Sequence, residues 1–122
     1  MEYDEIIERS QKPIFFGKID GAVESEEENA ICGDHIKIYL LVENNRIKDA
    51  KFSGKGCSIS FTSADLIIEK AIGKSIDEVL KWDENFVREL IGIPLGINRI
   101  KCALLPLNVL KSAILKNKNT KS

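Results

Sequence analysis

Residues 36–52 read IKIYLLVENNRIKDAKF, and this stretch decides the fold class. From Ile36 to Val42 an aliphatic residue stands at every second position, which is the period of a β-strand with one apolar face. Asn44-Asn45 then supplies a two-residue turn, because asparagine tolerates positive φ. A return strand is expected over Arg46–Phe52, with a bulge near Lys48 because the apolar alternation shifts there.

The segments before this hairpin are expected to add one helix and one strand. Residues 2–10 favour a short helix that ends before Pro13, since the residue preceding proline is pushed out of the helical region. Gly17–Ser25 is expected to form a strand, closed by a solvated acidic turn at Glu26–Glu28. The resulting three-stranded antiparallel sheet needs helices over its apolar face, which predicts an α+β fold.

The segments after the hairpin predict those helices. Apolar residues at i, i+3, i+4, i+7 and i+8 from Ala64 to Ile72 mark a helix that begins near Cys57 and stops at Gly73. A last helix is expected to run to about Lys116 and to begin or kink near Pro106. The remaining expectations are two short helices at 75–82 and 83–90, a loop at 92–99 and a disordered tail at 117–122.

Composition limits the classes of function. A chain of 122 residues with 43% hydrophobic content is expected to form one domain over 1–122. The net charge is −1 with both signs mixed along the chain, which argues against nucleic acid as a partner. Short apolar runs and an acidic N-terminus predict no membrane association and a cytoplasmic location. In a reducing compartment, three cysteines are core thiols, nucleophiles or metal ligands.

The three cysteines lie near the ends of predicted elements. Cys32 is in a loop, Cys57 begins a helix, and Cys102 is expected at the start of the last helix, where a helix N-terminus favours a thiolate. Asp34 follows Cys32 by two residues and can present a carboxylate on the same side. Three thiolates and one carboxylate suit tetrahedral zinc or the two irons of a small cluster. Spacing alone leaves open three unrelated buried thiols, since free cysteine commonly packs as a small apolar residue.

The contexts of the cysteines carry a family resemblance. They read AICGD at 30–34, GKGCSIS at 54–60 and IKCALL at 100–105. In this order they resemble the U-type iron–sulfur cluster assembly scaffolds, namely IscU, SufU and the N-terminal domain of NifU, over about 17–114. The resemblance implies the SufE/NifU-like (IscU-like) fold. It also implies that the ligands are Cys32, Asp34, Cys57 and Cys102.

The resemblance further implies a function. In this family a cysteine desulfurase delivers sulfur to a scaffold cysteine, and Cys32 and Cys102 are the candidate persulfide acceptors. A [2Fe–2S] cluster is then completed and passed to apo iron–sulfur proteins. Such a protein is a scaffold more than an enzyme in the usual sense. The alternative within the family is a zinc-dependent, SufU-type sulfurtransferase that accepts persulfide from the desulfurase.

Two departures from the family pattern separate these alternatives. Lys101 stands where IscU and NifU usually have histidine, as in SufU, but the connection over 82–101 is short, as in IscU. The Leu-Pro-Pro-Val-Lys segment that IscU presents to its Hsp70-type chaperone is absent, so that partnership is not implied. Lys101 is expected either at the surface or as a cation beside Cys102 or Asp34. The single histidine, His35, is expected to face solvent, because neighbouring strand residues point to opposite faces.

Overall fold

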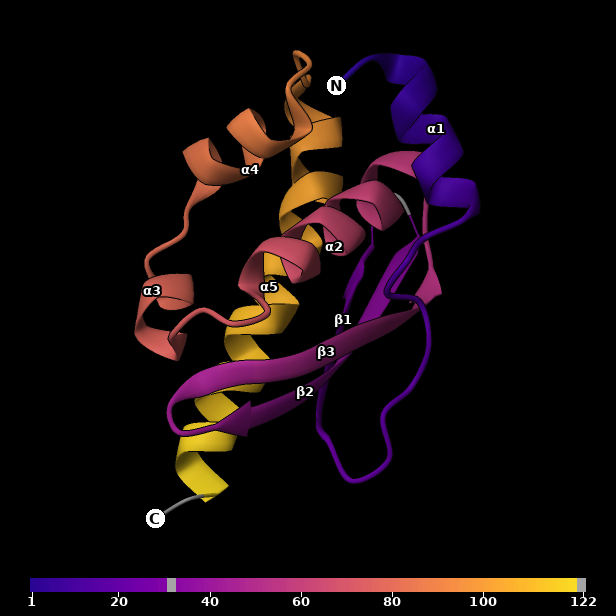
Figure 1. The fold of residues 1–122 in the computed structure, drawn as a ribbon. Helices are drawn as coiled ribbons and strands as arrows, with labels where there is room; N and C mark the ends of the chain where they lie inside the picture. The colour runs from indigo at the N-terminus through magenta and orange to yellow at the C-terminus, as the bar shows by residue number, and fades with distance from the viewer. Residues whose placement is uncertain (31–32, 121–122) are drawn as a thin grey trace.

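The computed structural model describes residues 1–30 and 33–120, in which one antiparallel sheet is covered by helices (Figure 1). The strand order is β1-β2-β3, with β1 at Val23–Asn29, β2 at Asp34–Glu43 and β3 at Arg46–Lys55. The predicted α+β class and three-stranded sheet are confirmed. The helices are α1 (Tyr3–Gln11), α2 (Ser58–Ala71), α3 (Ile76–Leu80), α4 (Glu84–Ile91) and α5 (Ile97–Thr120).

The β2–β3 hairpin follows the sequence pattern closely. The side chains of Ile36, Ile38 and Leu40 are completely buried on the helix-covered face. Asn44 and Asn45 adopt φ of 53° and 64°, as a tight hairpin turn requires. Leu41 pairs with Asp49 and Val42 with Ile47, so the residue between Ile47 and Asp49 is the extra residue of a bulge, and the predicted bulge at Lys48 is confirmed.

The first strand differs from the prediction. It runs over Val23–Asn29 instead of Gly17–Ser25, and the acidic residues 26–28 lie inside it instead of forming a turn. The chain near Gly17 pairs with the opposite edge of the sheet, where the Gly17 amide donates to the Phe52 carbonyl at 2.8 Å. An edge strand accepts a run of charged residues because half of its side chains face water and can pair with cations on the neighbouring strand.

The last helix is longer than the sequence predicted at both ends. It begins at Ile97, inside the expected 92–99 loop, and reaches Thr120. The disorder expected over 117–122 is therefore wrong as far as Thr120, and residues 121–122 lie outside the described part. Asn117 is 7% exposed, so packing extends the helix beyond the point where the apolar stripe fades. Pro106 lies in the helix interior without ending it.

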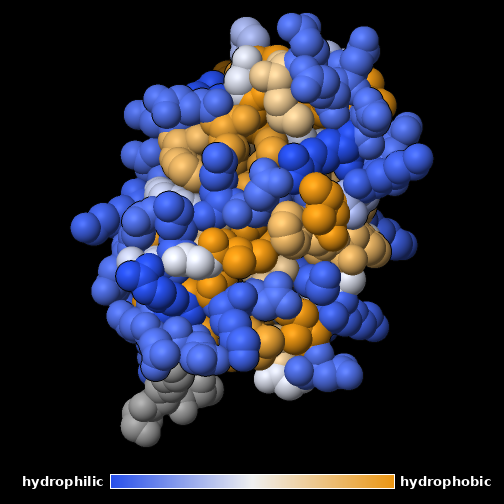
Figure 2. All heavy atoms as spheres, viewed as in Figure 1, coloured by the Kyte–Doolittle hydropathy of each residue, from blue (hydrophilic) through white to orange (hydrophobic). Residues whose placement is uncertain are grey.

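Helices α2 and α5 pack against each other and form the cover of the sheet (Figure 1). Two buried hydroxyls of α2 tie the neighbouring helices to it. Thr62 Oγ1 donates to the Ile6 carbonyl of α1 at 2.7 Å, and Ser63 Oγ donates to the Ala103 carbonyl of α5 at 2.6 Å. Figure 2 shows polar side chains over most of this face, with apolar ones in broken patches across its middle. Among the described residues, no helix combines the length and apolar character needed to cross a membrane.

Candidate metal centre

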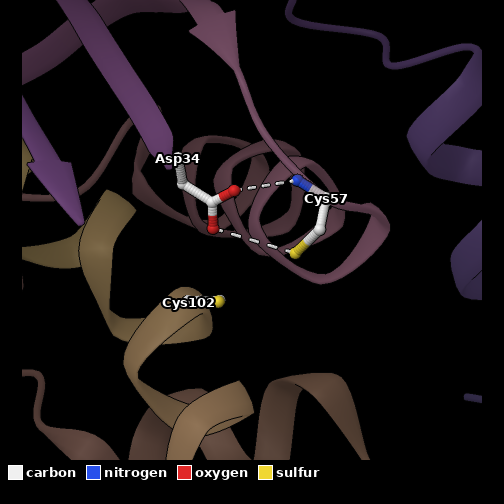
Figure 3. A group of neighbouring side chains, drawn as sticks. All are labelled: Asp34, Cys57 and Cys102. Carbon is white, nitrogen blue, oxygen red and sulfur yellow. Dashed lines mark hydrogen bonds between the residues drawn. The ribbon is translucent and has the colours of Figure 1, made fainter. Parts of the chain in front are cut away.

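Asp34 supplies a buried carboxylate at the point where β2 begins. Asp34 is 3% exposed, and its Oδ1 accepts a hydrogen bond from the backbone N–H of Cys57 at 3.2 Å. Oδ2 lies 3.8 Å from Cys57 Sγ (Figure 3). Aspartate often accepts hydrogen bonds from nearby loop amides. Here Asp34 accepts from the Cys57 amide, which follows β3, and its Oδ2 is directed at the Cys57 sulfur.

Cys57 is the N-cap of α2. Its Sγ accepts from the backbone N–H of Ser60 at 3.5 Å, and the residue is exposed to solvent. A sulfur at a helix N-terminus faces unpaired N–H groups and the positive end of the helix dipole. The predicted placement of Cys57 is confirmed.

Two glycines allow the chain to reach this position. A Cβ on Gly54 would lie 1.9 Å from the His35 carbonyl oxygen, so β3 could not approach β2 there with a larger residue. A Cβ on Gly56 would lie 2.2 Å from Ser60 Oγ, the hydroxyl that donates to the Cys57 carbonyl at 3.1 Å. Gly54, Gly56 and Ser60 of the GKGCSIS segment therefore shape the bend that presents Cys57.

Cys102 approaches from α5. It is 3% exposed, and its sulfur points toward Asp34 and Cys57 (Figure 3). Because α5 begins at Ile97, Cys102 lies in the second turn, so the prediction that it starts the helix is wrong. The helix dipole acts within the first turn and gives this thiol little support. The Nδ2 group of Asn29, at the end of β1, is 4.0 Å from its sulfur and donates to it.

Together these three residues form a set of converging ligand atoms. One carboxylate oxygen and two sulfurs, from Asp34, Cys57 and Cys102, all lie within 4.8 Å of one another. Ligands of one tetrahedral zinc ion, with Zn–S of about 2.3 Å and Zn–O of about 2.0 Å, lie about 3.5–3.8 Å apart. Side-chain movements of less than about 1 Å would thus bring all three onto one ion, and thiolate–carboxylate chemistry fits zinc or iron.

The remaining predicted ligand, Cys32, lies outside the described residues. Its neighbour Gly33 is described and adopts φ of 73°, with its amide donating to the Asn29 carbonyl at 2.8 Å. The ligand role of Cys32 stays a prediction.

His35 and Lys101 point away from the converging atoms. His35 Nε2 lies 2.9 Å from Glu26 Oε2 on β1, and its side chain is 35% exposed, as expected for the face opposite Asp34. Lys101 is exposed and lines a separate cavity with Glu27 and Glu28. Of the two alternatives for Lys101, the structure therefore has the surface residue.

Two residues of the cavity around the ligand set were missed by the sequence analysis, Tyr3 and Arg99. Tyr3 begins α1, and nothing in its local sequence distinguishes it. Arg99 precedes Cys102 by three residues, which places both on one face of a helix. That spacing could have been used had the helix been predicted to begin before Arg99.

Comparison with known proteins agrees with this geometry. The family model described as the NifU-like N-terminal domain matches residues 1–122. The chain belongs to this family. The iron–sulfur cluster assembly scaffold protein IscU of Thermotoga maritima is 37% identical, over 95% of this chain and 94% of that protein. The zinc-dependent sulfurtransferase SufU of Bacillus subtilis is 27% identical, over 91% of this chain and 87% of that protein.

Solved structures give the same result. A crystal structure described as the iron–sulfur cluster assembly scaffold for the SUF system of Fervidobacterium islandicum AW-1 superposes with a TM-score of 0.80. It is 33% identical and covers 93% of this chain and 96% of that one. The NifU-like N-terminal protein of Brucella abortus, 16% identical with a TM-score of 0.74, shares the fold. The chain is thus a member of the iron–sulfur cluster scaffold family, with both IscU-type and SufU-type relatives.

Proposed function

We propose that this protein is a scaffold on which a [2Fe–2S] cluster is assembled and from which it is passed to apo iron–sulfur proteins. The observation that carries the proposal is the convergence of Asp34, Cys57 and Cys102 within 4.8 Å, beside an exposed opening. Cys32, two residues before Asp34, completes the proposed ligand set. The cluster is the cargo of this site. Its sulfur would come from a cysteine desulfurase, with Cys32 and Cys102 as the candidate persulfide acceptors.

The chemistry of each residue suits a carrier. Thiolates bind the irons of a cluster firmly, whereas a carboxylate is a harder and weaker ligand for them. Asp34 would therefore keep the assembled cluster releasable. Cys57 is exposed and Cys102 is buried, so residues of this set would hold a cluster at a place that an acceptor protein could reach from the side of Cys57.

A second candidate function is favoured by Lys101. A histidine at this position would offer a neutral nitrogen to iron, whereas lysine at neutral pH is a protonated cation and a poor ligand. Three thiolates and Asp34 would then also suit resident zinc, as in a zinc-dependent sulfurtransferase. Zinc bound there would hold the thiolates together and lower their basicity.

The experiment that decides between the two starts with metal analysis. Protein purified aerobically is expected to contain about one zinc per chain, given this ligand set. Anaerobic incubation with iron, cysteine and a desulfurase is then expected to build a [2Fe–2S] cluster, followed by visible absorption and by transfer to an apo-ferredoxin. If no transferable cluster forms while the zinc-loaded protein accelerates the desulfurase, the scaffold proposal is wrong and the sulfurtransferase takes its place.

The shared ligand set has its own test. Replacing any one of Cys32, Cys57 and Cys102 with serine should sharply weaken metal binding, because a compact site cannot easily recruit another ligand. Binding is measured by competition with a chromophoric chelator. One-to-one binding at full affinity by all three variants would contradict a joint site.

A further inference from the structure

The cavity at the ligand set has a second chemical component. It measures about 250 Å³, and Tyr3 and Arg99 form its wall beside Asp34, Cys57 and Cys102. Neither Tyr3 nor Arg99 is a ligand type for zinc or a cluster in the proposed site. They come from opposite ends of the chain, 96 residues apart, and meet only through the fold.

Arg99 is held in place by Tyr3. Its Nη1 donates to Tyr3 Oη at 3.1 Å, and its Cζ lies 5.8 Å from the centroid of the tyrosine ring. The hydrogen bond to Tyr3 and the Coulomb interaction with Tyr3, and less strongly the Coulomb interactions with Cys57 and Cys102, raise the pKa of Arg99. The guanidinium therefore stays charged, and it retains donors that can reach an anion because Tyr3 engages one of its nitrogens.

Charge is distributed unevenly around this cavity. Its described lining contains one carboxylate, two thiols and a single cation, which is Arg99. Lys101, two residues further along α5, lines the other cavity beside the acidic strand β1. The two neighbouring cations thus face different surroundings, and only Arg99 faces the thiols.

We propose that Arg99, oriented by Tyr3, is the recognition residue for an anionic sulfur donor, namely the persulfide of a partner protein. This inference rests on the proposed function, in which the site receives sulfur. A thiolate of the site attacks the outer sulfur of the donor persulfide. A new S–S bond forms as the donor's S–S bond breaks, and the donor's inner sulfur leaves as a thiolate. The outer sulfur keeps its charge or proton, so no external oxidant or reductant is needed.

This step brings two negatively charged sulfurs together. Coulomb repulsion opposes their approach, and a fixed cation at the mouth of the cavity offsets it. For an exposed cation at low salt the expected gain is about threefold to fivefold in rate, and salt should remove most of it because exposed charges are screened.

The test compares two alkylating reagents on the reduced, metal-free protein. Iodoacetate is an anion and iodoacetamide is neutral, so the ratio of their rates at Cys57 reports the local charge independently of the reactivity of the thiol. Mass spectrometry of the Cys57 peptide gives both rates. In Arg99→Gln the rate with iodoacetate divided by the rate with iodoacetamide is expected to fall about threefold to fivefold at low salt. At high salt this ratio is expected to equal that of the protein without the substitution.

Lys101→Gln is the matched control, because it removes the same charge from the same helix two residues away. Its ratio is expected to stay unchanged, whereas Tyr3→Phe, which keeps the ring and loses the hydrogen bond, should show a smaller fall than Arg99→Gln. Tyr3, Arg99 and Lys101 are exposed, so thermal unfolding should be nearly unaffected. An unchanged ratio in Arg99→Gln, or an equal fall in Lys101→Gln, overturns the proposal.

A second measurement separates this inference from the proposed function. Radiolabelled sulfur is followed from a loaded desulfurase to the scaffold in a single turnover. Slower transfer to Arg99→Gln, with normal transfer to Lys101→Gln, supports the proposal. Unchanged transfer to Arg99→Gln overturns it. If the unmodified protein takes up no sulfur at all, the proposed function fails, and the alkylation ratio still reports whether Arg99 attracts anions.

Discussion

Two acidic side chains are buried among the described residues, Asp34 and Asp65, and their surroundings differ sharply. Asp65, in α2, is completely buried and accepts three hydrogen bonds. Oδ2 accepts from Arg9 Nε at 2.7 Å and from the Ile14 amide at 3.1 Å, and Oδ1 accepts from the Phe15 amide at 2.7 Å. Asp34 accepts one backbone hydrogen bond on Oδ1 and turns Oδ2 toward sulfur.

The difference shows how burial alone fails to identify a functional carboxylate. All the partners of Asp65 are strong donors from its own chain, including a guanidinium, so its negative charge is neutralised within the fold. The second oxygen of Asp34 faces a weak S–H donor, which a metal ion can displace as the thiol ionises. Asp65 is therefore structural, and Asp34 has the capacity to bind.

The two carboxylates are nevertheless connected through α1. Asp65 fixes Arg9 and the segment after α1 onto α2, and α1 carries Tyr3 at its other end, beside the candidate metal centre. A structural carboxylate thus sets the position of one wall of the cavity in which Asp34 lies.

The largest expected effect is on stability, from Asp65→Ala. Removing this carboxylate leaves the partly buried guanidinium of Arg9 and two amides without their acceptor, which should lower the free energy of unfolding by about 3–5 kcal/mol. Urea or guanidinium denaturation measures the loss. Glu69→Gln is the control, because the Glu69 side chain is 44% exposed and pairs with Arg9 Nη2 at 3.2 Å near the surface. Its loss of stability should therefore be small. An equal loss of unfolding free energy in Asp65→Ala and Glu69→Gln would contradict the structural role given to Asp65.

The next effect concerns binding, from Asp34→Asn. Asparagine can still accept from the Cys57 amide but has no charge to offer a metal, so the fold should be retained with a change of about 1 kcal/mol or less. Metal affinity should fall by at least about tenfold, since even changes outside the ligand shell cost that much. Asp34→Ala should likewise leave the fold intact and slow cluster transfer to an apo-acceptor. Unchanged affinity and transfer kinetics would reduce Asp34 to a structural cap.

The sequence predicted one of these carboxylates and not the other. Asp34 stands in the Cys-Gly-Asp segment at 32–34, and the family resemblance of that segment implied a ligand role for it. Asp65 follows Ala64 in a helix whose apolar stripe predicts only one covered face. In the structure α2 is covered by the sheet, α5 and α1 together, so a polar position becomes buried by a contact that no local pattern encodes.

The other errors have the same origin. The acidic run at 26–28 suggested a turn, but pairing with β2 makes it part of an edge strand. The end of the apolar stripe near Lys116 suggested a helix terminus, yet packing keeps Asn117 buried one residue later. Arg99 was missed because its relation to Cys102 depends on where α5 begins. Periodicity thus determines the elements with strong apolar alternation, while edges and ends depend on tertiary neighbours.

A smaller effect is expected from Thr62→Val, which sharpens the role of α1. Valine keeps the shape of threonine but loses the 2.7 Å hydrogen bond to the Ile6 carbonyl, which should cost about 1 kcal/mol of stability. Amide hydrogen exchange should rise in α1 and stay unchanged in α5. Ser63→Ala is the matched variant, since its 2.6 Å bond to Ala103 holds α5 instead, and it should produce the opposite pattern. Equal exchange profiles would mean that α1 and α5 are not held separately.

The smallest effect is expected at a third, exposed carboxylate, Glu24 on β1, which pairs with Lys37 at 2.8 Å. The hydrogen bond from Lys37 lowers the pKa of Glu24 below its ordinary 4.5, and the same bond raises that of Lys37 above 10.5. The Glu24 contribution is therefore present above about pH 4.5 and lost as the pH falls through the lowered pKa. Glu24→Gln should thus lower the thermal midpoint near neutral pH by less than Thr62→Val does. The difference in thermal midpoint between Glu24→Gln and the protein without the substitution should shrink toward zero as the pH is lowered to about 3, because the Glu24 carboxylate is then protonated and uncharged, like glutamine. A difference that persists in acid would show that Glu24 acts by packing instead of by charge.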